Sequence, residues 1–553
     1  MATGTIDAMR VLSAAEMQAC DLLTTERFAV PSLQLMRNAS AAVSSFALEV
    51  FPRARRVTVL CGRGNNGGDG MMTARLLADA GVAVLVLLLG SPDGLKDDAA
   101  EAWCELQAAG SCRIHVIETE ADLTLHADAL EAELLIDAVL GTGFKPPLKG
   151  LALSALEWIK AASAPILAVD LPSGWPADET KSRPDTPVFP ADAVVTFTAP
   201  KPAHVFGELT RRWDQPVIVA PIGSPDEAIV SKREIEWAGS AQSLLHRPRK
   251  ADVNKGSFGH VLVVGGTFGS AGGKAGAPSM TSLAAMRVGA GLVTAAVPAA
   301  ALPVVSGFAP ELMTHPLKTN ESGEIAADNL ESDGLASLIK GITVLALGPG
   351  LGQGRDVRKF QTLLLFGTKM PVVIDADGLN NLAAADLSPK SNFLSELAKD
   401  GRTVVLTPHP GEMARLAGIK TAEVQADRLN VARRFALEHR VTLVLKGART
   451  LIAHPDGRVA VNTTGNPGMA KGGSGDLLTG VIAGLLAQFK DDPARAVEAA
   501  VFLHGLAGDL AVREMDEHTM LATDTLPKFS QAFRFHSRTD TGYVWLQGMP
   551  AGN

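Results

Sequence analysis

Short apolar runs alternate with segments of helical periodicity along the whole chain. Each run is rich in β-branched residues and ends in a turn that contains glycine, proline or a polar side chain, as buried strands do. The runs lie at residues 57–61, 134–136, 166–169, 261–264, 344–347, 372–374, 404–406 and 442–445. Because helical patterns between strands are typical of βαβ units, the chain is predicted to be an α/β protein with largely parallel sheets.

The first helix is marked by a capping box. Ser13 and Glu16 stand at the positions where a hydroxyl and a carboxylate satisfy the free N–H groups of a helix start. The helix is predicted to reach about Phe28. Pro31 ends it, and apolar spacing over residues 33–46 predicts a second helix.

The length of 553 residues exceeds what one core supports, so we expect more than one domain. Residues 223–250 are polar, charged and proline-containing without apolar periodicity, which indicates a connecting arm. We therefore predict two three-layer α/β/α domains, residues 1–228 and residues 229–553, with a boundary near Ala228.

Composition excludes several classes of protein. A net charge of −8 argues against nucleic acid as a partner. The longest apolar runs are strand-length, well short of the roughly 20 residues that span a membrane, and the first ten residues show no signal peptide. The cysteines lack the spacing of a zinc site or a disulfide framework, which indicates a reducing cytoplasm; they are Cys20, Cys61, Cys104 and Cys112.

Polar residues follow three strands of the first half. The strand at 57–61 is followed by Gly62-Arg-Gly-Asn-Asn-Gly-Gly-Asp-Gly70, and Asp137 and Asp170 end the next two candidate strands. Each Asp alone is adequately explained as a helix cap. Together they indicate a ligand crevice, because the carboxyl ends of parallel strands meet at one edge. Carboxylate, amide and hydroxyl oxygens suit a hard cation.

The motifs GNNGGDG, IDAVLGTG and AVDLPSG resemble the NAD(P)H-hydrate epimerase family, also called the YjeF N-terminal domain, over residues 12–221. The resemblance implies a Rossmann-like domain that interconverts the two C6 epimers of hydrated NADH or NADPH with a bound potassium ion. It assigns Asn66, Asp137 and Ser173 to potassium. It assigns Asp170 to the reacting ring as the proton-transfer group, provided that burial brings its pKa towards the working pH.

The same resemblance assigns two loops to substrate binding: Asn65, Asn66, Gly67, Gly68, Asp69, Gly141, Thr142, Gly143, Phe144, Lys145, Pro146 and Pro147. The chain departs from the family pattern at Arg37, where an acid is usual, and at Ser40, where glycine is usual. A tyrosine often follows the GTG motif, but the one tyrosine of this chain is Tyr543.

The stretch Gly465-Asn-Pro-Gly-Met-Ala-Lys-Gly-Gly-Ser-Gly-Asp476 runs into a helical pattern beginning at Leu477. Glycines allow close approach of the backbone, and free N–H groups at a helix start attract anions. Asp476 alone is explained as an N-cap, but the glycines are not. The stretch is therefore predicted to be a phosphate cradle with an acid or base beside it.

Two other strands of the second half are followed by turns that contain a candidate functional residue. His409 lies between two prolines in TPHPGE, which makes a functional and a structural role about equally plausible. Lys446 follows the strand at 442–445, where it could meet a phosphate or remain a solvated strand end.

The motifs GSFGHVLVVGG, GAGLVT, GPGLG, VIDADGLN, LTPHPGE, LKGART, GNPGMAKGGSGD and HGLAGD occur in this order and resemble the NAD(P)H-hydrate dehydratase family of ribokinase-like fold, over residues 249–526. The resemblance implies ADP-dependent dehydration of the S hydrate, giving AMP and phosphate, with a magnesium ion. Asp476 is then the base on the substrate hydroxyl. The hydrate contacts are Ala277, Gly352, His409 and Asp476. The nucleotide contacts are Lys446, Gly447, Ala448, Arg449, Thr450 and Gly475.

Two departures stand out in this half. Residues 270–277 are longer than the usual turn, and Lys471 replaces a common threonine, which we expect to add charge near the phosphates. The substrates expected are the hydrates NADHX and NADPHX with ADP, and the chain is expected to form a homo-oligomer. Two alternatives remain open: a ribokinase-like kinase of a small alcohol, and a first domain retained only for binding or oligomerisation.

Overall fold

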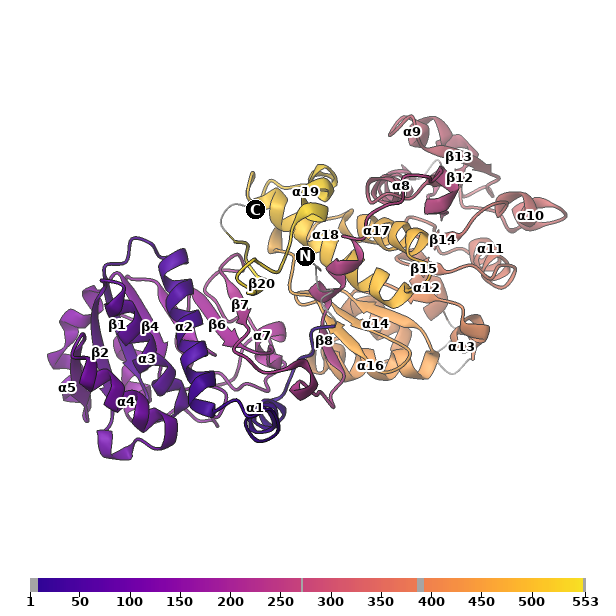
Figure 1. Ribbon diagram of the computed structural model, residues 1–553. Helices are drawn as coiled ribbons and strands as arrows, with labels where there is room; N and C mark the ends of the chain where they lie inside the picture. Colours follow the sequence, from indigo (N-terminus) through magenta and orange to yellow (C-terminus); the bar gives the residue numbers. More distant parts are fainter. Residues whose placement is uncertain (1–7, 270–271, 385–391, 551–553) are drawn as a thin grey trace. The chain divides into compact units, whose positions relative to one another are not determined.

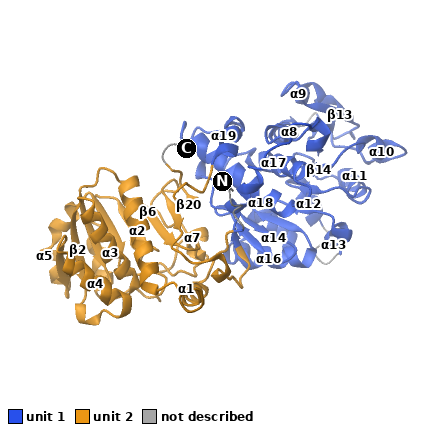
Figure 2. Cartoon of the chain, in the orientation of Figure 1, with its two compact units in different colours: residues 1–8, 236–535 blue, residues 9–235, 536–553 orange. Residues whose placement is uncertain are grey.

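The computed structural model describes residues 8–269, 272–384 and 392–550. The chain divides into two compact units, coloured separately in Figure 2. The first unit comprises the described residues of Met9–Ile235 and His536–Asn553 and is the orange one, labelled unit 2 in Figure 2. The second comprises the described residues of Glu236–Phe535 together with Ala8 and is the blue one, labelled unit 1 there. Each unit is built on its own sheet, as the alternating pattern predicts.

The first unit contains an eight-stranded sheet in the order β20-β7-β6-β5-β4-β1-β2-β3 (Figure 1). All neighbours pair in parallel except β20. The strands are β1 Arg56–Cys61, β2 Ala83–Leu89, β3 Arg113–Ile117, β4 Leu134–Ala138, β5 Ile166–Val169, β6 Ala193–Phe197, β7 Val217–Ala220 and β20 Val544–Gln547. Their continuous apolar sequences follow from burial on both faces.

Two separate apolar clusters cover the two faces of this sheet. Val59 packs into one cluster with residues of α2, α3 and α4, whereas the adjacent Leu60 packs into the other with residues of α5 and α6. The helices of this unit are α1 Ala14–Phe28, α2 Ser32–Val50, α3 Asn65–Asp79, α4 Asp97–Ala109, α5 Glu120–Leu125, α6 Leu151–Ile159 and α7 Pro202–Phe206. The three-layer α/β/α prediction is confirmed here, and so is the capping box of Ser13 and Glu16.

The last strand of the chain belongs to the first unit, although residues 229–553 were assigned to one domain by sequence. β20 pairs antiparallel with β7 and covers what would otherwise be a bare sheet edge. The Tyr543 hydroxyl donates to the Ala42 carbonyl at 3.1 Å, and the Trp545 ring packs beside Phe46. The assignment of residues 536–550 to the second domain was wrong, because a short strand does not encode which sheet it joins.

The second unit contains a ten-stranded sheet in the order β13-β12-β9-β14-β15-β16-β17-β18-β19-β8. Strands from β13 to β17 pair in parallel, and β17, β18 and β19 form an antiparallel meander. The strands are β8 Ile235–Trp237, β9 His260–Val264, β12 Leu292–Pro298, β13 Met313–Leu317, β14 Val344–Leu347, β15 Val372–Ile374, β16 Val404–Leu406, β17 Thr442–Leu445, β18 Leu451–Ala453 and β19 Val459–Val461. A small separate hairpin joins β10 Phe268–Gly269 and β11 Gly272–Gly273.

Helix α17 packs against α8 and α18, and it lies on β9, β14 and β15. The helices of the second unit are α8 Gly276–Arg287, α9 Leu302–Ser306, α10 Gly334–Leu338, α11 Arg355–Phe366, α12 Asp377–Ala383, α13 Phe393–Leu397, α14 Pro410–Ala417, α15 Thr421–Ala426, α16 Arg428–His439, α17 Ser474–Gln488, α18 Pro493–Val512 and α19 Phe529–Arg534. Within the described part of the chain, no helix has the length and apolar character needed to cross a membrane.

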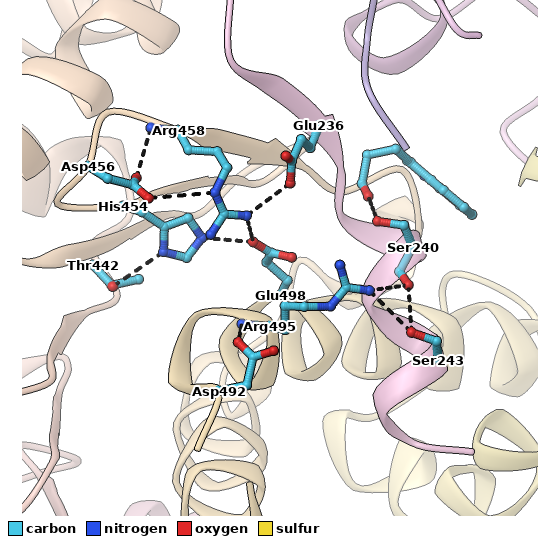
Figure 3. A network of polar contacts seen from close by, with 11 residues as sticks. Glu236, Ser240, Ser243, Thr442, His454, Asp456, Arg458, Asp492, Arg495 and Glu498 are labelled. Atoms are coloured by element: carbon cyan, nitrogen blue, oxygen red, sulfur yellow. Dashed lines mark hydrogen bonds and ion pairs between the residues drawn. The ribbon is translucent and has the colours of Figure 1, made fainter. Parts of the chain in front are cut away.

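The stretch expected to be a connecting arm contains ordered structure of the second unit. Strand β8 and the following 3-10 helix (Ala238–Leu244) are largely buried. Glu236 of β8 accepts from Arg458 Nη1 at 2.9 Å, and the same nitrogen donates to Glu498 of α18 at 2.8 Å (Figure 3). His454 Nε2 also lies 2.9 Å from Glu498 Oε1. This buried network joins β8, the β18–β19 turn and α18.

Candidate functional site

The first unit has a cavity of about 1400 Å³ at the carboxyl ends of its central strands. The structure gathers many of the predicted substrate residues on its wall: Asn65, Asn66, Asp69, Gly141, Thr142, Gly143, Phe144, Lys145 and Asp170. The remaining predicted residues do not line it; these are Gly67, Gly68, Pro146 and Pro147, with Asp137 and Ser173 of the predicted cation site. Strand-end reasoning therefore located a real cavity.

Asp170 follows β5 directly and is held by donors from three segments. The Thr142 N–H donates to its Oδ2 at 3.0 Å, and the Thr142 hydroxyl donates to the same oxygen. Thr196 Oγ1 and Lys201 Nζ each donate to Oδ1 at 2.8 Å. Burial alone would raise the pKa of Asp170, but the Lys201 ammonium and these donors hold it below its usual range. The condition set for proton transfer by Asp170, a pKa raised by burial, is therefore not met, because the buried lysine lowers that pKa.

Lys201 is a site residue that the sequence analysis missed. It follows β6 in the Pro-Lys-Pro turn before α7, and its side chain is 2% exposed. His204 fixes this turn, since its Nδ1 accepts from the Lys201 N–H and its Nε2 lies 2.7 Å from the Asp170 carbonyl. Burial and the Lys201 charge lower the pKa of His204 to about 4, so the ring is neutral. The sequence feature that could have predicted Lys201 as a site residue is its position between two prolines just after a strand.

Two further carboxyl groups share this cavity. Burial raises the pKa of Asp21 on α1 to about 6, and repulsion by Asp170 acts in the same direction against the attraction of Lys201. Burial and the charges of Asp170 and Asp21 raise the pKa of Asp69 well above its usual value. The cavity therefore combines a carboxylate whose pKa is lowered with two carboxyl groups whose pKa values are raised. Asp21 was also missed, because α1 is distant in sequence from the motif loops.

Asp137 and Ser173 form the buried pair expected at a potassium site. Ser173 donates its hydroxyl to Asp137 Oδ1 at 2.6 Å and its N–H to Oδ2 at 2.8 Å. Burial raises the pKa of Asp137 to about 6, against the hydrogen bonds from Ser173 and Val139, and no cationic side chain among the described residues forms an ion pair with it. The Asn66 side chain has a buried Nδ2 with no hydrogen-bond partner in the described part of the structure, and only its Oδ1 is a possible ligand of a cation. The carboxylate and hydroxyl oxygens of Asp137 and Ser173, with the amide oxygen of Asn66, are of the kind that hard cations bind.

A Cβ on Gly141 would lie 3.0 Å from Asn66 Oδ1 and 3.2 Å from Asp170 Oδ2. The glycine of the GTG motif therefore leaves room for two polar groups that come from different strand ends. Within the described ranges, no cluster of three or more His, Cys, Asp or Glu side chains is arranged to hold a metal ion. The oxygens that fit potassium at the Asp137 site include an amide and a hydroxyl as well as a carboxylate.

The two family departures in α2 lie away from the cavity wall. Arg37 forms an ion pair with Glu105 of α4 at 2.6 Å. The Ser40 hydroxyl is buried and donates to the carbonyls of Met36 and Asp69. Both substitutions thus have structural partners. The single tyrosine of the chain, Tyr543, lies on the β20 side of the unit, so no tyrosine lines the cavity.

In the second unit the glycine-rich stretch leads directly into α17, as predicted. Gly473 is the N-cap with φ of +98°, a conformation that favours glycine. Asp509 of α18 accepts from the Gly465 N–H and from Asn466 Nδ2, both at 2.9 Å. The HGLAGD motif therefore holds the start of the loop. Burial raises the pKa of Asp509 to about 7, so this contact is also sensitive to pH.

Asp476 lies in the first turn of α17, beside a buried lysine–carboxylate pair. Lys446 Nζ donates to Asp375 Oδ1 at 2.8 Å, and the Thr479 hydroxyl donates to Oδ2 at 2.9 Å. Burial and repulsion by Asp375 raise the pKa of Asp476 to about 6, against the attraction of Lys446. Among the described residues, none donates a hydrogen bond to the Asp476 side chain. Its carboxylate is consequently available to a ligand.

Gly475 brings the loop close to this charged pair. A Cβ there would lie 3.3 Å from Lys446 Nζ and 3.5 Å from Asp375 Oδ2. Asp375 and Glu412, whose Oε2 lies 3.8 Å from Lys446 Nζ, were not predicted as site residues. Asp375 lies in the motif VIDADGLN and Glu412 in LTPHPGE, each just after a strand, so their position after a strand could have predicted them.

The other predicted residues of the second unit surround this centre. The Thr281 hydroxyl of α8 donates to the carbonyls of Asp476 and Ala277. Ala277 therefore lies near the start of α17. The Gly352 N–H and Lys274 Nζ each donate to Asp377 Oδ2 at 3.0 Å. Ala277 and Gly352 therefore flank a second lysine–carboxylate pair at this edge.

His409 has a structural use in this conformation. Its Nδ1 accepts from the N–H groups of Gly411 and Glu412 and so caps α14, while about half of the side chain remains exposed. The turn at 446–450 is held from α16, since Arg428 donates to the carbonyls of Ala448 and Leu445. Arg449 donates to the Thr463 carbonyl, and the Thr450 hydroxyl to that of Gly447. The predicted nucleotide turn is thereby fixed in shape.

Lys471 does not point freely into the loop. Its Nζ donates to the carbonyls of His518 and Met520, both at 2.5 Å. Its ammonium ties the glycine loop to residues 518–520, whereas we expected its charge to lie near the phosphates.

The fold and these contacts define the class of the protein. The second unit is a ribokinase-like α/β domain with a glycine loop, a lysine and an acid at one strand edge, joined to a Rossmann-like α/β domain. Residues 261–530 match the family model described as NAD(P)H-hydrate dehydratase. Residues 32–203 match the model described as YjeF-related protein N-terminus.

Relatives match almost the whole chain. The bifunctional NAD(P)H-hydrate repair enzyme Nnr of Moorella thermoacetica is 39% identical over 94% of this chain and 95% of its own. The enzyme of the same name from Coxiella burnetii is 38% identical, over 91% and 96%. A solved structure of the ADP/ATP-dependent NAD(P)H-hydrate dehydratase from Bacillus subtilis, co-crystallised with ATP/Mg²⁺, is 31% identical, with a TM-score of 0.44, over 54% of this chain and 96% of that chain. The chain belongs to the family of bifunctional NAD(P)H-hydrate repair enzymes.

Proposed function

We propose that the chain repairs hydrated nicotinamide dinucleotides in two steps. The first unit interconverts the R and S epimers of NADHX and NADPHX, and the second dehydrates the S epimer with ADP, giving NAD(P)H, AMP and phosphate. The observation that carries the second step is the Asp476 carboxylate, which accepts no hydrogen bond from any described residue and stands where the glycine-rich loop leads into α17. Family membership supports both steps.

In the dehydratase step Asp476 removes the proton of the C6 hydroxyl, and that oxygen attacks the terminal phosphorus of ADP. The bond from this phosphorus to the bridging oxygen breaks, and AMP leaves. The C6–O bond of the phosphorylated hydrate then breaks with departure of phosphate, and loss of the C5 proton restores the reduced ring. The loop N–H groups and Lys446 stabilise the charge that grows on the transferred phosphoryl group.

The epimerase step uses the contrast between carboxyl groups in the first unit. Asp170 stays ionised and stabilises the cationic ring that forms when the C6 hydroxyl leaves as water. A protonated carboxyl group such as Asp21 or Asp69 supplies the proton to the leaving hydroxyl and takes one from water that adds to the other face. Lys201 keeps Asp170 charged. One water leaves C6 and one water adds to it, so the substrate keeps its composition and changes only its configuration.

We propose a potassium ion at Asn66, Asp137 and Ser173, where it would supply the positive charge that the buried Asp137 lacks. Magnesium would accompany the ADP phosphates, where the Asp476 edge of the second unit offers carboxylate oxygen. ADP rather than ATP as donor, a homo-oligomer and a cytoplasmic location complete the proposal. Replacing potassium by a tetramethylammonium salt should slow epimerisation and leave dehydration of the S hydrate unchanged.

The test is incubation of the full chain with hydrated NADH and either ADP or ATP. Recovery of reduced-nicotinamide absorbance with release of phosphate supports dehydration. A stable phosphorylated product would instead support a small-alcohol kinase. Direct measurement of R-to-S conversion in the Asp476→Asn chain tests the first unit, and absence of conversion would leave that unit as a binding module.

A further inference from the structure

Arg63 lies on the loop between β1 and α3 and lines the first-unit cavity. Its side chain is exposed, and no carboxylate or other acceptor in the described ranges forms an ion pair or hydrogen bond with it. Two other arginines of this unit, Arg37 and Arg75, both pair with Glu105. Arg63 is therefore a cation at a cavity wall whose guanidinium has no partner among the residues that the structure describes.

Two glycines leave room for this side chain. A Cβ at Gly90 would lie 3.0 Å from Arg63 Cδ and 3.1 Å from its Nε, and a Cβ at Gly94 would lie 2.7 Å from Nη1. The arginine therefore extends along the loop that follows β2. Gly90 has φ of +103° and needs glycine for its backbone, but Gly94 has no positive φ. The missing side chain at Gly94 serves to leave space for the guanidinium.

The loop of Arg63 adjoins the reacting end of the cavity. A Cβ on Gly62 would lie 2.0 Å from the Val139 carbonyl oxygen, so this loop packs against the segment leading to Thr142, which binds Asp170. The cavity volume of about 1400 Å³ exceeds the roughly 300–1,000 Å³ of ordinary small-molecule pockets. It has room for the phosphates of a dinucleotide as well as for its nicotinamide ring.

We propose that Arg63 is a phosphate-binding residue of the epimerase site and recognises the dinucleotide part of the substrate. This inference rests on the proposed epimerase function. A guanidinium offers a planar pair of donors that matches phosphate oxygens, and an unpaired one keeps them available. The phosphate is either the pyrophosphate bridge, present in both hydrates, or the 2′-phosphate, present in NADPHX alone.

The test compares Arg63→Gln and Gly94→Ala with the unaltered full chain, measuring R-to-S conversion of NADHX and of NADPHX separately. Loss of a charge-assisted hydrogen bond should raise KM about tenfold or more in Arg63→Gln, with kcat within about twofold. Gly94→Ala retains the arginine but fills its place, so a smaller rise in the same direction is expected. Arg75→Gln, which removes a paired arginine that does not line the cavity, should leave both KM values unchanged.

The pattern across substrates identifies the phosphate. Equal rises for both hydrates assign Arg63 to the pyrophosphate, and a rise for NADPHX alone assigns it to the 2′-phosphate. Unchanged KM for both hydrates in Arg63→Gln, or a loss confined to kcat, would overturn the inference while leaving the epimerase function intact. If the unaltered chain fails to interconvert either hydrate, the proposed function itself is wrong.

Discussion

Lys201 Nζ lies 2.8 Å from Asp170 Oδ1, and the two side chains are only 2% and 10% exposed. A buried ion pair of this kind costs desolvation on both sides and is maintained here by the threonine donors around it. Its consequence is a carboxylate whose charge is fixed across the physiological pH range.

Replacing Lys201 by Met should destabilise the first unit by about 3–5 kcal/mol, because the Asp170 carboxylate is left buried and unpaired. The folded pKa of Asp170 lies below its unfolded value, so the stabilisation is present above about pH 4 and is lost as acid protonates the group. Denaturant unfolding at pH 7 measures it. The double variant Lys201→Met/Asp170→Leu should recover stability but no epimerase activity; recovered activity would make the pair purely structural.

Replacing Asp476 by Asn should lower the dehydration rate by about 10²–10⁴-fold, because the hydroxyl loses its base. Nucleotide affinity should change little, since the glycine loop and Lys446 remain. Single-turnover recovery of NADH and calorimetric ADP binding check the two parts. Asp491→Asn, at an exposed position nearby in sequence, is the control, and near-normal turnover in Asp476→Asn would remove this residue from the mechanism.

The dehydration rate should fall as pH drops below about 6, because the pKa of Asp476 is raised to about 6 and the base must be ionised. Asp375→Asn removes a repelling charge and should move the inflection of kcat/KM to lower pH. Lys274→Met removes an attracting charge and should move it to higher pH. If the inflection of kcat/KM lies at the same pH in the unaltered chain and in both variants, a group other than Asp476 titrates.

Replacing Glu498 by Gln should destabilise the second unit by about 3–5 kcal/mol, since it removes the buried negative charge that Arg458 and His454 share. The unfolding transition of that unit, followed by hydrogen exchange, gives the measurement. Asp456→Asn is the matched control, because that carboxylate is 63% exposed and should matter by less than about 0.5 kcal/mol. Equal effects of the two substitutions would contradict the network shown in Figure 3.

Sequence reasoning succeeded where function is encoded in contiguous motifs. The loops at Asn65–Asp69, Gly141–Lys145 and Gly465–Asp476 follow strands, and parallel strands bring their ends together by geometry alone. Asp170 and Asp476 were located in this way, but the direction of their pKa shifts was not, because it depends on neighbours from other elements. Lys201 and Asp21 reach the same cavity from β6 and α1.

The sequence also does not reveal which side chains contact partners that are distant along the chain. In the sequence Arg63 is an ordinary residue of a glycine loop, and only the structure shows that Gly94, in the segment after β2, lies beside its guanidinium. Lys471 reads as a phosphate ligand until the carbonyls of His518 and Met520 are found beside its ammonium. In each case the decisive partner lies far along the chain.

The pairing of β20 with β7 makes the second unit an insertion within the first. The strand at Val544–Gln547 is synthesised only after all of Glu236–Phe535, so the first sheet reaches its full width after the residues of the other unit have already left the ribosome. A chain cut at residue 228 would present β7 as an open edge and expose the surface that Tyr543 and Trp545 cover. The sheet of the epimerase half is thus complete only in a chain that retains Val544–Gln547.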